Sequence, residues 1–265
     1  METGVSTPPS RVEHGLDRAT LITYAVLLLI TAGAWVHVVT AMPGGDMAGM
    51  DMVMTPTLVD AAAYVGAWAI MMAAMMLPSA LPMLGLYAAT QKTGQWPTKV
   101  VGVGLFALVY VALWALTGVP VYAASLGLMA VTADTLVYVV AGVLIGAGVF
   151  QLTPLKQVCL RHCRSPIGFL LGHWRAGWRG ALAMGWAHAV YCLGCCWALM
   201  LVLVVAGAMG LPWVLLIACV VAAEKVLPHG DAIARVTGVA LVLLGVAVAV
   251  RPALATALRS SGASM

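Results

Sequence analysis

Charged side chains are scarce in this chain. Only 8% of its 265 residues are Asp, Glu, Lys or Arg, whereas soluble globular domains contain roughly 25%. The first residues lack the basic start of a secretory signal, and the chain has no Gly-Lys-Ser/Thr loop for nucleotide phosphates. The scarcity of charge excludes a soluble domain. Without a secretory signal, the first apolar run is expected to stay uncleaved. Without a phosphate-binding loop, ATP-driven transport by this chain is not expected.

Apolar residues, by contrast, make up 63% of the chain and are grouped in long runs. About 20 apolar residues cross the roughly 30 Å hydrocarbon core of a bilayer. The runs therefore predict an all-α polytopic membrane protein with about seven transmembrane helices. The predicted spans are 21–42, 58–89, 100–130, 136–155, 181–209, 211–227 and 233–250. Pro78, Pro82 and Pro120 lie inside the two longest runs and are expected to kink the helices.

The positions of the basic residues predict the orientation of the chain. If the N-terminus is cytoplasmic, all Lys and Arg residues except Arg251 and Arg259 lie on cytoplasmic segments. We therefore interpret the net charge of +4 as a topology signal rather than as a sign of nucleic-acid binding. The expected organisation is a polar cytoplasmic tail (1–20), one transmembrane domain (21–255) with a Met-rich extracytoplasmic loop (42–56) and a basic cytoplasmic segment (156–179), and a C-terminal tail (256–265).

The predicted outer loop is rich in methionine and contains two carboxylates but no basic residue. Thioether sulfur is a soft ligand that favours Cu(I), and the glycines of the loop allow several side chains to wrap around one ion. The alternative is that flexible apolar side chains hold the loop at the membrane interface. The candidate metal ligands in this loop are Met47, Met50, Met52, Met54, Asp46 and Asp51.

Four further methionines lie in the second span, shortly before Pro78. At 100° per residue they cover an arc of about 140° and can line one face of a helix. On the functional interpretation, this face continues the route of a metal ion inward from the outer loop. The alternative is ordinary packing, which is the usual role of methionine in an apolar helix. The four candidates are Met71, Met72, Met75 and Met76.

The fifth span carries three cysteines and a histidine near its middle. Helical geometry places Cys192, Cys195 and Cys196 within about 80° of His188, so that an imidazole and two or three thiols share one face. A polar group at this depth is costly unless it is satisfied, which makes it a candidate for function. Cysteine alone packs like a small apolar residue, but this combination is typical of a soft-metal site. Cys219 in the sixth span is a candidate for a further sulfur.

Another group follows the fourth span, with Cys159, His162 and Cys163 at helical spacing. Basic residues flank the group, and their charge is expected to lower the pKa of the thiols. These basic residues are Lys156, Arg161 and Arg164. We interpret the segment either as an inner release or regulatory site for a metal, or as a basic interfacial helix that binds lipid phosphate. Because the cysteines face a reducing cytosol or the bilayer, we expect free thiols rather than disulfides.

Glu224 and Lys225 are adjacent charged residues near the inner end of the sixth span. Long charged side chains at the end of a membrane helix usually extend to the interface. We interpret the two residues as such a pair rather than as a proton relay.

Several of these motifs together resemble one bacterial family. They are Gln151-Leu-Thr-Pro-Leu-Lys156, Cys159, Cys163-Arg-Ser-Pro166, Tyr191-Cys-Leu-Gly-Cys-Cys-Trp197 and Glu224-Lys225. From about Met71 to about Gly245, the chain resembles predicted metal-binding integral membrane proteins of unknown function, some of which are labelled copper chaperones. The resemblance implies a polytopic fold, a bacterial cytoplasmic (inner) membrane and a metal, but it supplies no reaction.

Three hypotheses follow from the sequence. The first is a membrane protein that captures, transfers or chaperones Cu(I), with zinc as the alternative metal. On this hypothesis, which we favour, the protein is not an enzyme. Its expected partners are membrane lipids, the metal ion and a copper enzyme or membrane complex. The second is a copper- or thiol-dependent membrane oxidoreductase or one of its subunits, although adjacent helical cysteines bridge poorly and catalytic copper sites usually contain several histidines. The third is a non-catalytic subunit of a larger complex.

Overall fold

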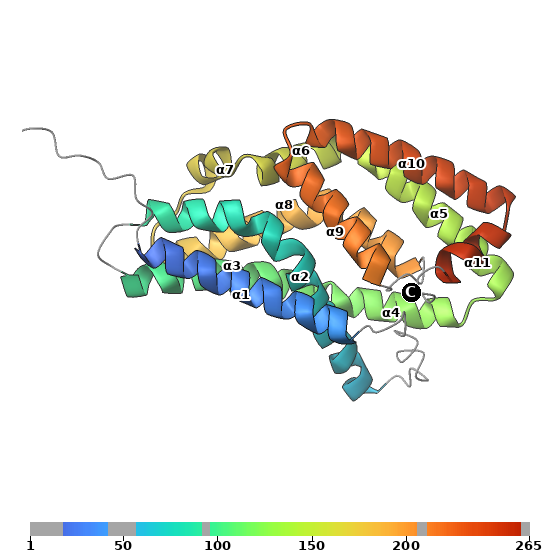
Figure 1. Ribbon diagram of the computed structural model, residues 1–265, viewed down its shortest axis with the longest axis horizontal. Coiled ribbons are helices and arrows are strands. Elements are labelled where there is room, and N and C mark those ends of the chain that lie inside the picture. The colour runs from blue at the N-terminus through green and yellow to red at the C-terminus, as the bar shows by residue number, and fades with distance from the viewer. Residues whose placement is uncertain (1–17, 42–56, 92–95, 206–210, 261–265) are drawn as a thin grey trace, which may run out of the picture.

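The computed structural model describes residues 18–41, 57–91, 96–205 and 211–260, and all regular secondary structure within these residues is α-helical (Figure 1). The helices are α1 (Arg18–Ala41), α2 (Leu58–Thr90), α3 (Trp96–Leu116), α4 (Gly118–Met129), α5 (Ala133–Leu152), α6 (Pro154–Arg164), α7 (Pro166–His173), α8 (Gly177–Val205), α9 (Leu211–Val226), α10 (Gly230–Val250) and α11 (Ala253–Ser260). The predicted all-α fold class is confirmed.

Six segments within the described residues are long and apolar enough to cross a membrane. They are α1, α2, α3 together with α4, α5, α8 and α10. The seventh predicted span corresponds to α9, which has 16 residues and is therefore about 24 Å long. Within the described residues, this length is less than the roughly 30 Å hydrocarbon core, and α9 is not among the six segments. The predicted orientation of the chain stays a prediction.

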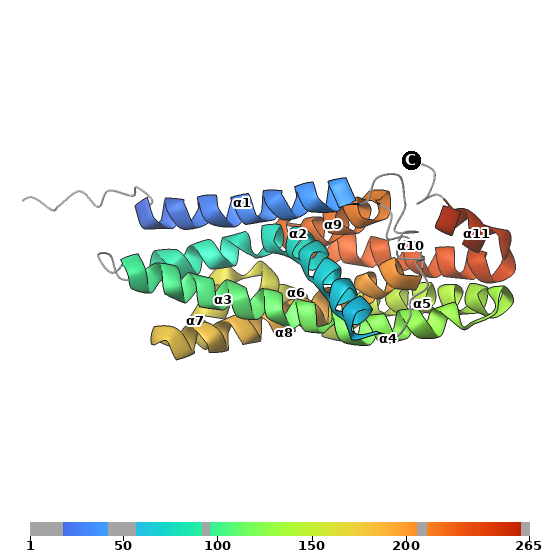
Figure 2. The same cartoon turned by 90° about the horizontal axis from the view of Figure 1, so that it is seen from below.

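The molecule is elongated, and most of its long helices run roughly along its long axis (Figures 1 and 2). α5 and α10 lie side by side towards one end, whereas α1, α3 and the C-terminal part of α2 pack together towards the other. In the most apolar stretch of α8, 67% of the residues are buried, compared with 22% in α1 and α10. α8 is therefore the central helix, around which the other elements place their side chains.

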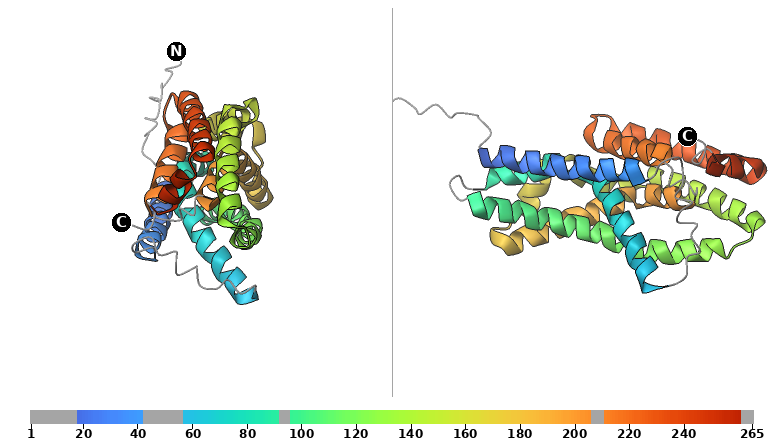
Figure 3. Two further views of the ribbon diagram at one scale, coloured as in Figure 1. Left: turned by 90° about the vertical axis from the view of Figure 1, so that its right-hand side faces the viewer. Right: turned by 60° about the horizontal axis from the view of Figure 1, so that its bottom comes forward.

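Two prolines bend α2 near its middle. Pro78 and Pro82 lie inside this helix, where each lacks the N–H of an intrahelical hydrogen bond and its ring crowds the preceding turn. The bend is visible in Figure 2, and in Figure 3 the N-terminal part of α2 leans away from the other helices. The predicted kink is confirmed. It leaves the residues around Met76 inside the bundle, where Met76 is fully buried.

α5 and α10 approach closely because glycines lie at their contact. A Cβ atom added to Gly148 would lie 2.6 Å from the carbonyl oxygen of Gly238, and one added to Gly238 would lie 2.9 Å from the carbonyl oxygen of Gly148. A larger residue at either position would push the helices apart. The close pair brings the end of α5 beside the start of α10.

A sharp turn joins α5 to α6. The Thr153 hydroxyl accepts a hydrogen bond from the main-chain N–H of Lys156, and Pro154 begins the new helix. Both features are typical of a helix N-terminus. The turn directs α6 across α8, so that Leu160 and Cys163 are buried against the central helix.

Candidate functional site

The three cysteines of α8 lie in the interior of the bundle. Cys192, Cys195 and Cys196 are all buried, and the thiols of Cys195 and Cys196 donate to the main-chain carbonyl of Cys192, with sulfur–oxygen distances of 3.1 and 2.8 Å. These bonds hold both sulfur atoms close to the preceding helical turn. The central helix therefore presents three ordered thiols to its interior neighbours.

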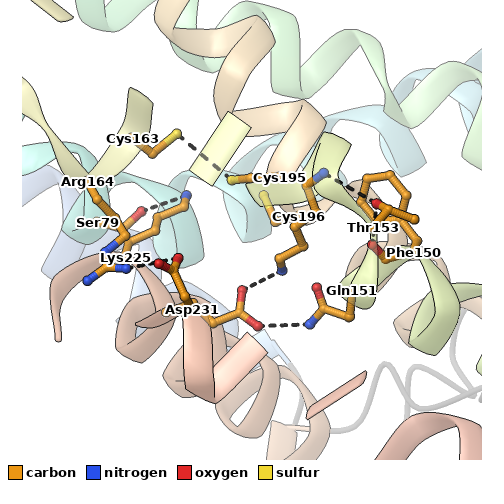
Figure 4. A network of polar contacts seen from close by, with 12 residues as sticks. Ser79, Phe150, Gln151, Thr153, Cys163, Arg164, Cys195, Cys196, Lys225 and Asp231 are labelled. Carbon is orange, nitrogen blue, oxygen red and sulfur yellow. Dashed lines mark hydrogen bonds and ion pairs between the residues drawn. The ribbon is translucent and has the colours of Figure 1, made fainter. Parts of the chain in front are cut away.

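Two other helices bring sulfur atoms to the same place. The Sγ atom of Cys163 on α6 lies 3.9 Å from that of Cys195, and the Sδ atom of Met76 on α2 lies 3.9 Å from the Sγ atom of Cys196. Figure 4 shows Cys163 and Cys195 facing each other, with Cys196 beside them. We call this set the sulfur cluster; its members are Met76, Cys163, Cys192, Cys195 and Cys196.

The spacing within the sulfur cluster suits a shared soft ion. At about 2.3 Å per metal–sulfur bond, two sulfurs on one ion lie roughly 3.8–4.6 Å apart, depending on the coordination angle. The distances from Cys163 to Cys195 and from Met76 to Cys196 both fall in this range. Within the described residues, however, no three side chains drawn from His, Cys, Asp and Glu are already arranged as a metal site. A metal ion would therefore require the thiols to rotate away from the carbonyl of Cys192.

A buried ammonium group contacts the sulfur cluster. The Nζ atom of Lys225 on α9 lies 3.1 Å from the Sγ atom of Cys192, 3.2 Å from the hydroxyl of Ser79 and 3.9 Å from the Sδ atom of Met76. Its neighbour Glu224 faces away from this cluster. The interpretation of Glu224 and Lys225 as a pair that extends to the interface is therefore wrong: both residues are buried and each has its own partners.

Hydroxyl groups complete the surroundings of Lys225. The Tyr110 hydroxyl lies 3.0 Å from the Sγ atom of Cys192 and donates to the main-chain carbonyl of Met76 at 3.3 Å. The Ser79 hydroxyl donates to the same carbonyl at 2.9 Å. The carbonyl of Met76 thus binds two hydroxyls, of which that of Tyr110 also contacts Cys192 and that of Ser79 also contacts Lys225.

Glu224 belongs to a second buried network. Its carboxylate accepts hydrogen bonds from the Nζ atom of Lys156 at 2.6 Å and from the side-chain amide of Gln151 at 2.8 Å (Figure 4). All three side chains are almost completely buried. A buried ion pair is strongly destabilised when one partner is removed, so this network joins α5, α6 and α9 and holds α9 where Lys225 reaches the thiols.

His188 lies among aromatic rings rather than among thiols. Its ring stacks on Tyr110 with centroids 5.5 Å apart and also contacts Phe106 and Phe169. The Nδ1 atom of His188 is buried and has no hydrogen-bond partner. Its predicted role as a metal ligand stays a prediction.

The predicted group on α6 is spread along the contact with α8. Cys163 joins the sulfur cluster, Cys159 lies beside Gly194, and the ring of His162 stacks on Tyr191 with centroids 4.0 Å apart. The three side chains thus meet α8 at three successive places. Their shared role as ligands of one metal ion stays a prediction.

The expectation of lowered thiol pKa values on α6 is wrong. Burial raises the pKa of Cys159. Hydrogen bonds to the α8 thiols, together with burial, raise the pKa of Cys163. The flanking charges do not oppose these effects because Lys156 and Arg164 are each paired with a carboxylate from α9 or α10.

Other predicted residues have different surroundings. Met71, Met72 and Met75 are buried among apolar residues, whereas Met76 contacts the thiol of Cys196. Cys219 is exposed on α9, so the proposal that it adds a sulfur to the α8 cysteines is wrong. The loop candidates Met47, Met50, Met52, Met54, Asp46 and Asp51 lie outside the described residues.

Sequence reasoning missed the roles of Tyr110, Ser79 and Lys225 at the site. A lysine and a glutamate in an otherwise apolar helix are a signal that could have directed attention to α9, since ionisable groups within a membrane usually mark function. Tyr110 and Ser79 carry no comparable signal.

Comparisons with known proteins give one result. A family model described as "PpoB2: Copper chaperone" matches residues 65–248, a range that contains every member of the sulfur cluster as well as Lys225. No curated protein and no solved structure matches the chain.

Proposed function

Since the chain belongs to the PpoB2 copper chaperone family, we propose that this membrane protein carries copper as Cu(I) and holds the ion in its sulfur cluster. The observation that supports the proposal is the meeting of five buried sulfur atoms from α2, α6 and α8. Thiolate and thioether are the ligands that favour Cu(I). Copper is the cargo of the protein in this proposal and no reaction is assigned.

The charge of the site supports a monovalent ion. Cu(I) bound by two thiolates carries a net charge of −1, and the ammonium group of Lys225 balances it. Zn²⁺ bound by the same two thiolates is already neutral, so that Lys225 leaves a net charge of +1. An uncompensated charge in a buried site is costly. We therefore expect the sulfur cluster to prefer Cu(I) over zinc.

The proposed route of Cu(I) to the sulfur cluster begins at the Met-rich segment 42–56. The Met-rich segment 42–56 directly precedes α2, which carries Met76. We propose that the thioethers of this segment capture Cu(I) on the extracytoplasmic side of a bacterial cytoplasmic membrane and that Met76 receives it at the cluster. Thiolates hold Cu(I) more tightly than thioethers, so transfer from Met76 to the cysteines is favourable. Delivery to a copper enzyme and release across the membrane both agree with this route.

Copper binding by the purified protein tests the proposal. The wild type in detergent, loaded with Cu(I) under reducing conditions, is expected to retain copper against a chromogenic chelator, whereas a Cys192→Ser/Cys195→Ser/Cys196→Ser variant is expected to lose it. Cys219→Ser is the matched control, because this thiol is exposed on α9 and separate from the cluster. A wild type that retains no copper refutes the proposal. Retention by the triple variant, with loss after substitution of Met47, Met50 and Met52, places the main site in the outer segment.

A further inference from the structure

His162 and His173 lie on α6 and α7, and each uses its Nδ1 atom for a hydrogen bond within its own helix. The Nδ1 atom of His162 on α6 lies 2.9 Å from the carbonyl oxygen of Val158, and that of His173 on α7 lies 3.1 Å from the carbonyl oxygen of Phe169. A carbonyl oxygen can only accept, so each Nδ1 carries the proton. The Nε2 atom of each neutral ring therefore keeps its lone pair.

This arrangement is the one that metal-binding histidines commonly have. A ligating histidine usually donates its other ring N–H to a carbonyl or carboxylate, which sets the tautomer and the direction of the ring. Within the described residues, both His162 and His173 satisfy this condition through their own helices. In contrast, the Nδ1 atom of His188 has no such partner.

The two rings are close enough to share an ion. Their centroids are 6.4 Å apart, and their planes are inclined by 80°. With metal–nitrogen bonds of about 2.0 Å and each nitrogen roughly 1.2 Å from its ring centre, two imidazoles on one ion have centroids at most about 6.4 Å apart. The observed separation equals this limit, so the two rings can bind one ion when both Nε2 atoms face each other along the line between the ring centres.

Aromatic neighbours hold both rings in place. His162 stacks on Tyr191 with planes inclined by 2°, and His173 stacks on Phe169 with centroids 4.5 Å apart and planes inclined by 10°. Neither ring is fully buried. A stacked ring loses little conformational freedom when it binds an ion, and a partly exposed ring remains accessible from outside the bundle.

The pair also lies next to the sulfur cluster along the chain. His162 directly precedes Cys163, whose sulfur atom lies 3.9 Å from that of Cys195. α6 therefore carries both a partly exposed imidazole, at His162, and a buried thiol of the sulfur cluster, at Cys163. Imidazole binds Cu(I) less tightly than thiolate, so such an order of donors permits exchange at the outer end and retention at the inner end.

We propose that His162 and His173 form a two-imidazole copper port, through which Cu(I) enters or leaves the sulfur cluster. The proposal rests on the function proposed above for the cluster. It assigns to the port a kinetic role, because the cysteines determine how much copper is held and the histidines determine how fast it exchanges. Cu(I) is stable with two donors, so the pair needs no third ligand.

The rate of copper release tests the port. Full-length protein loaded with Cu(I) in detergent is mixed with an excess of bicinchoninate, and transfer to the chelator is followed by absorbance. In His162→Phe/His173→Phe the stacked rings remain but the nitrogens are lost. We expect the amount of bound copper to stay within twofold of the wild type and the release rate to fall at least tenfold. A release rate within twofold of the wild type overturns the proposal.

His229→Phe is the matched control, because His229 is exposed before α10 and its side chain makes no capping hydrogen bond. Its release rate is expected to equal that of the wild type. If the double Phe variant does not fold, His162→Gln and His173→Gln replace it, with the same expectation for the rate. An unchanged rate in both Gln variants also overturns the proposal.

A second measurement separates the port from the sulfur cluster. In a variant that lacks Cys192, Cys195 and Cys196, X-ray absorption of added Cu(I) is expected to show nitrogen ligands, and this signal should disappear when His162 and His173 are also replaced by Phe. Absence of nitrogen ligands in the first variant refutes the port alone. A wild type that retains no copper refutes the function proposed for the cluster, whether or not the nitrogen signal is present.

Discussion

Replacing Lys225 with methionine removes the positive charge that contacts the thiol of Cys192, while it preserves most of the side-chain volume. The ammonium nitrogen lies 3.1 Å from the Sγ atom of Cys192. At an effective dielectric constant of about 20, a unit charge at that distance stabilises a negative charge by about 5 kcal/mol. Several kcal/mol of this energy are offset by the cost of burying the ammonium group. We therefore expect a net loss of about 2 kcal/mol in Cu(I) binding, roughly a thirtyfold weaker affinity.

Competition titrations with a Cu(I) chelator and, separately, with a Zn²⁺ chelator measure this effect in wild type and Lys225→Met. The Cu(I) affinity is expected to fall while the Zn²⁺ affinity stays the same or rises, because the ammonium group opposes a divalent ion. Arg235→Met removes a charge from an exposed position on α10 and is expected to change neither affinity. Equal losses for both metals, or unchanged Cu(I) binding, would refute the charge-balance reasoning.

Two further predictions concern single side chains. Glu224→Gln leaves Lys156 buried without its carboxylate, so the free energy of unfolding in detergent should fall by about 3–5 kcal/mol. The double variant Lys156→Met/Glu224→Met is expected to recover this stability. If Glu224→Gln is as stable as the wild type, the role of this pair is contradicted. Met76→Leu should weaken Cu(I) binding several-fold because it removes the thioether beside Cys196. Met72→Leu, an equivalent change at a buried packing position, should leave binding unchanged, and equal effects of the two substitutions would show that packing rather than ligation is responsible.

The helical spans and the interior face of α8 could be predicted because both depend on local sequence. An apolar run of sufficient length forms a membrane helix whatever its neighbours are, and the spacing of Cys192, Cys195 and Cys196 determines that they share a side of the helix. The predicted span 211–227 agrees with α9 (Leu211–Val226) to within one residue. Hydropathy thus locates an apolar helix, but it does not show how that helix is placed in the bundle.

The partners of the α8 thiols could not be predicted, because they come from distant parts of the chain. Met76 and Cys196 are separated by 120 residues, and Lys225 and Cys192 by 33. Helical periodicity indicates which residues share a face, but it does not indicate which helix packs against that face. Cys219 was preferred as an additional sulfur because of its depth, whereas the direction of its side chain depends on the rotation of α9, and the structure places Lys225 rather than Cys219 against the cluster.

The bend of α2 distinguishes Met76 from the cysteines of α8 in how the main chain holds each side chain. Cys195 and Cys196 lie on one helix, so movements elsewhere in the bundle leave their main-chain positions unchanged relative to each other. Met76 lies beside the proline bend, at the base of a helical arm that leans away from the bundle (Figure 3). Any swing of that arm changes the distance from the thioether to the thiols and leaves the thiols unchanged. The cluster thus combines thiols that are carried by one helix with a thioether that is carried by a separate helical arm.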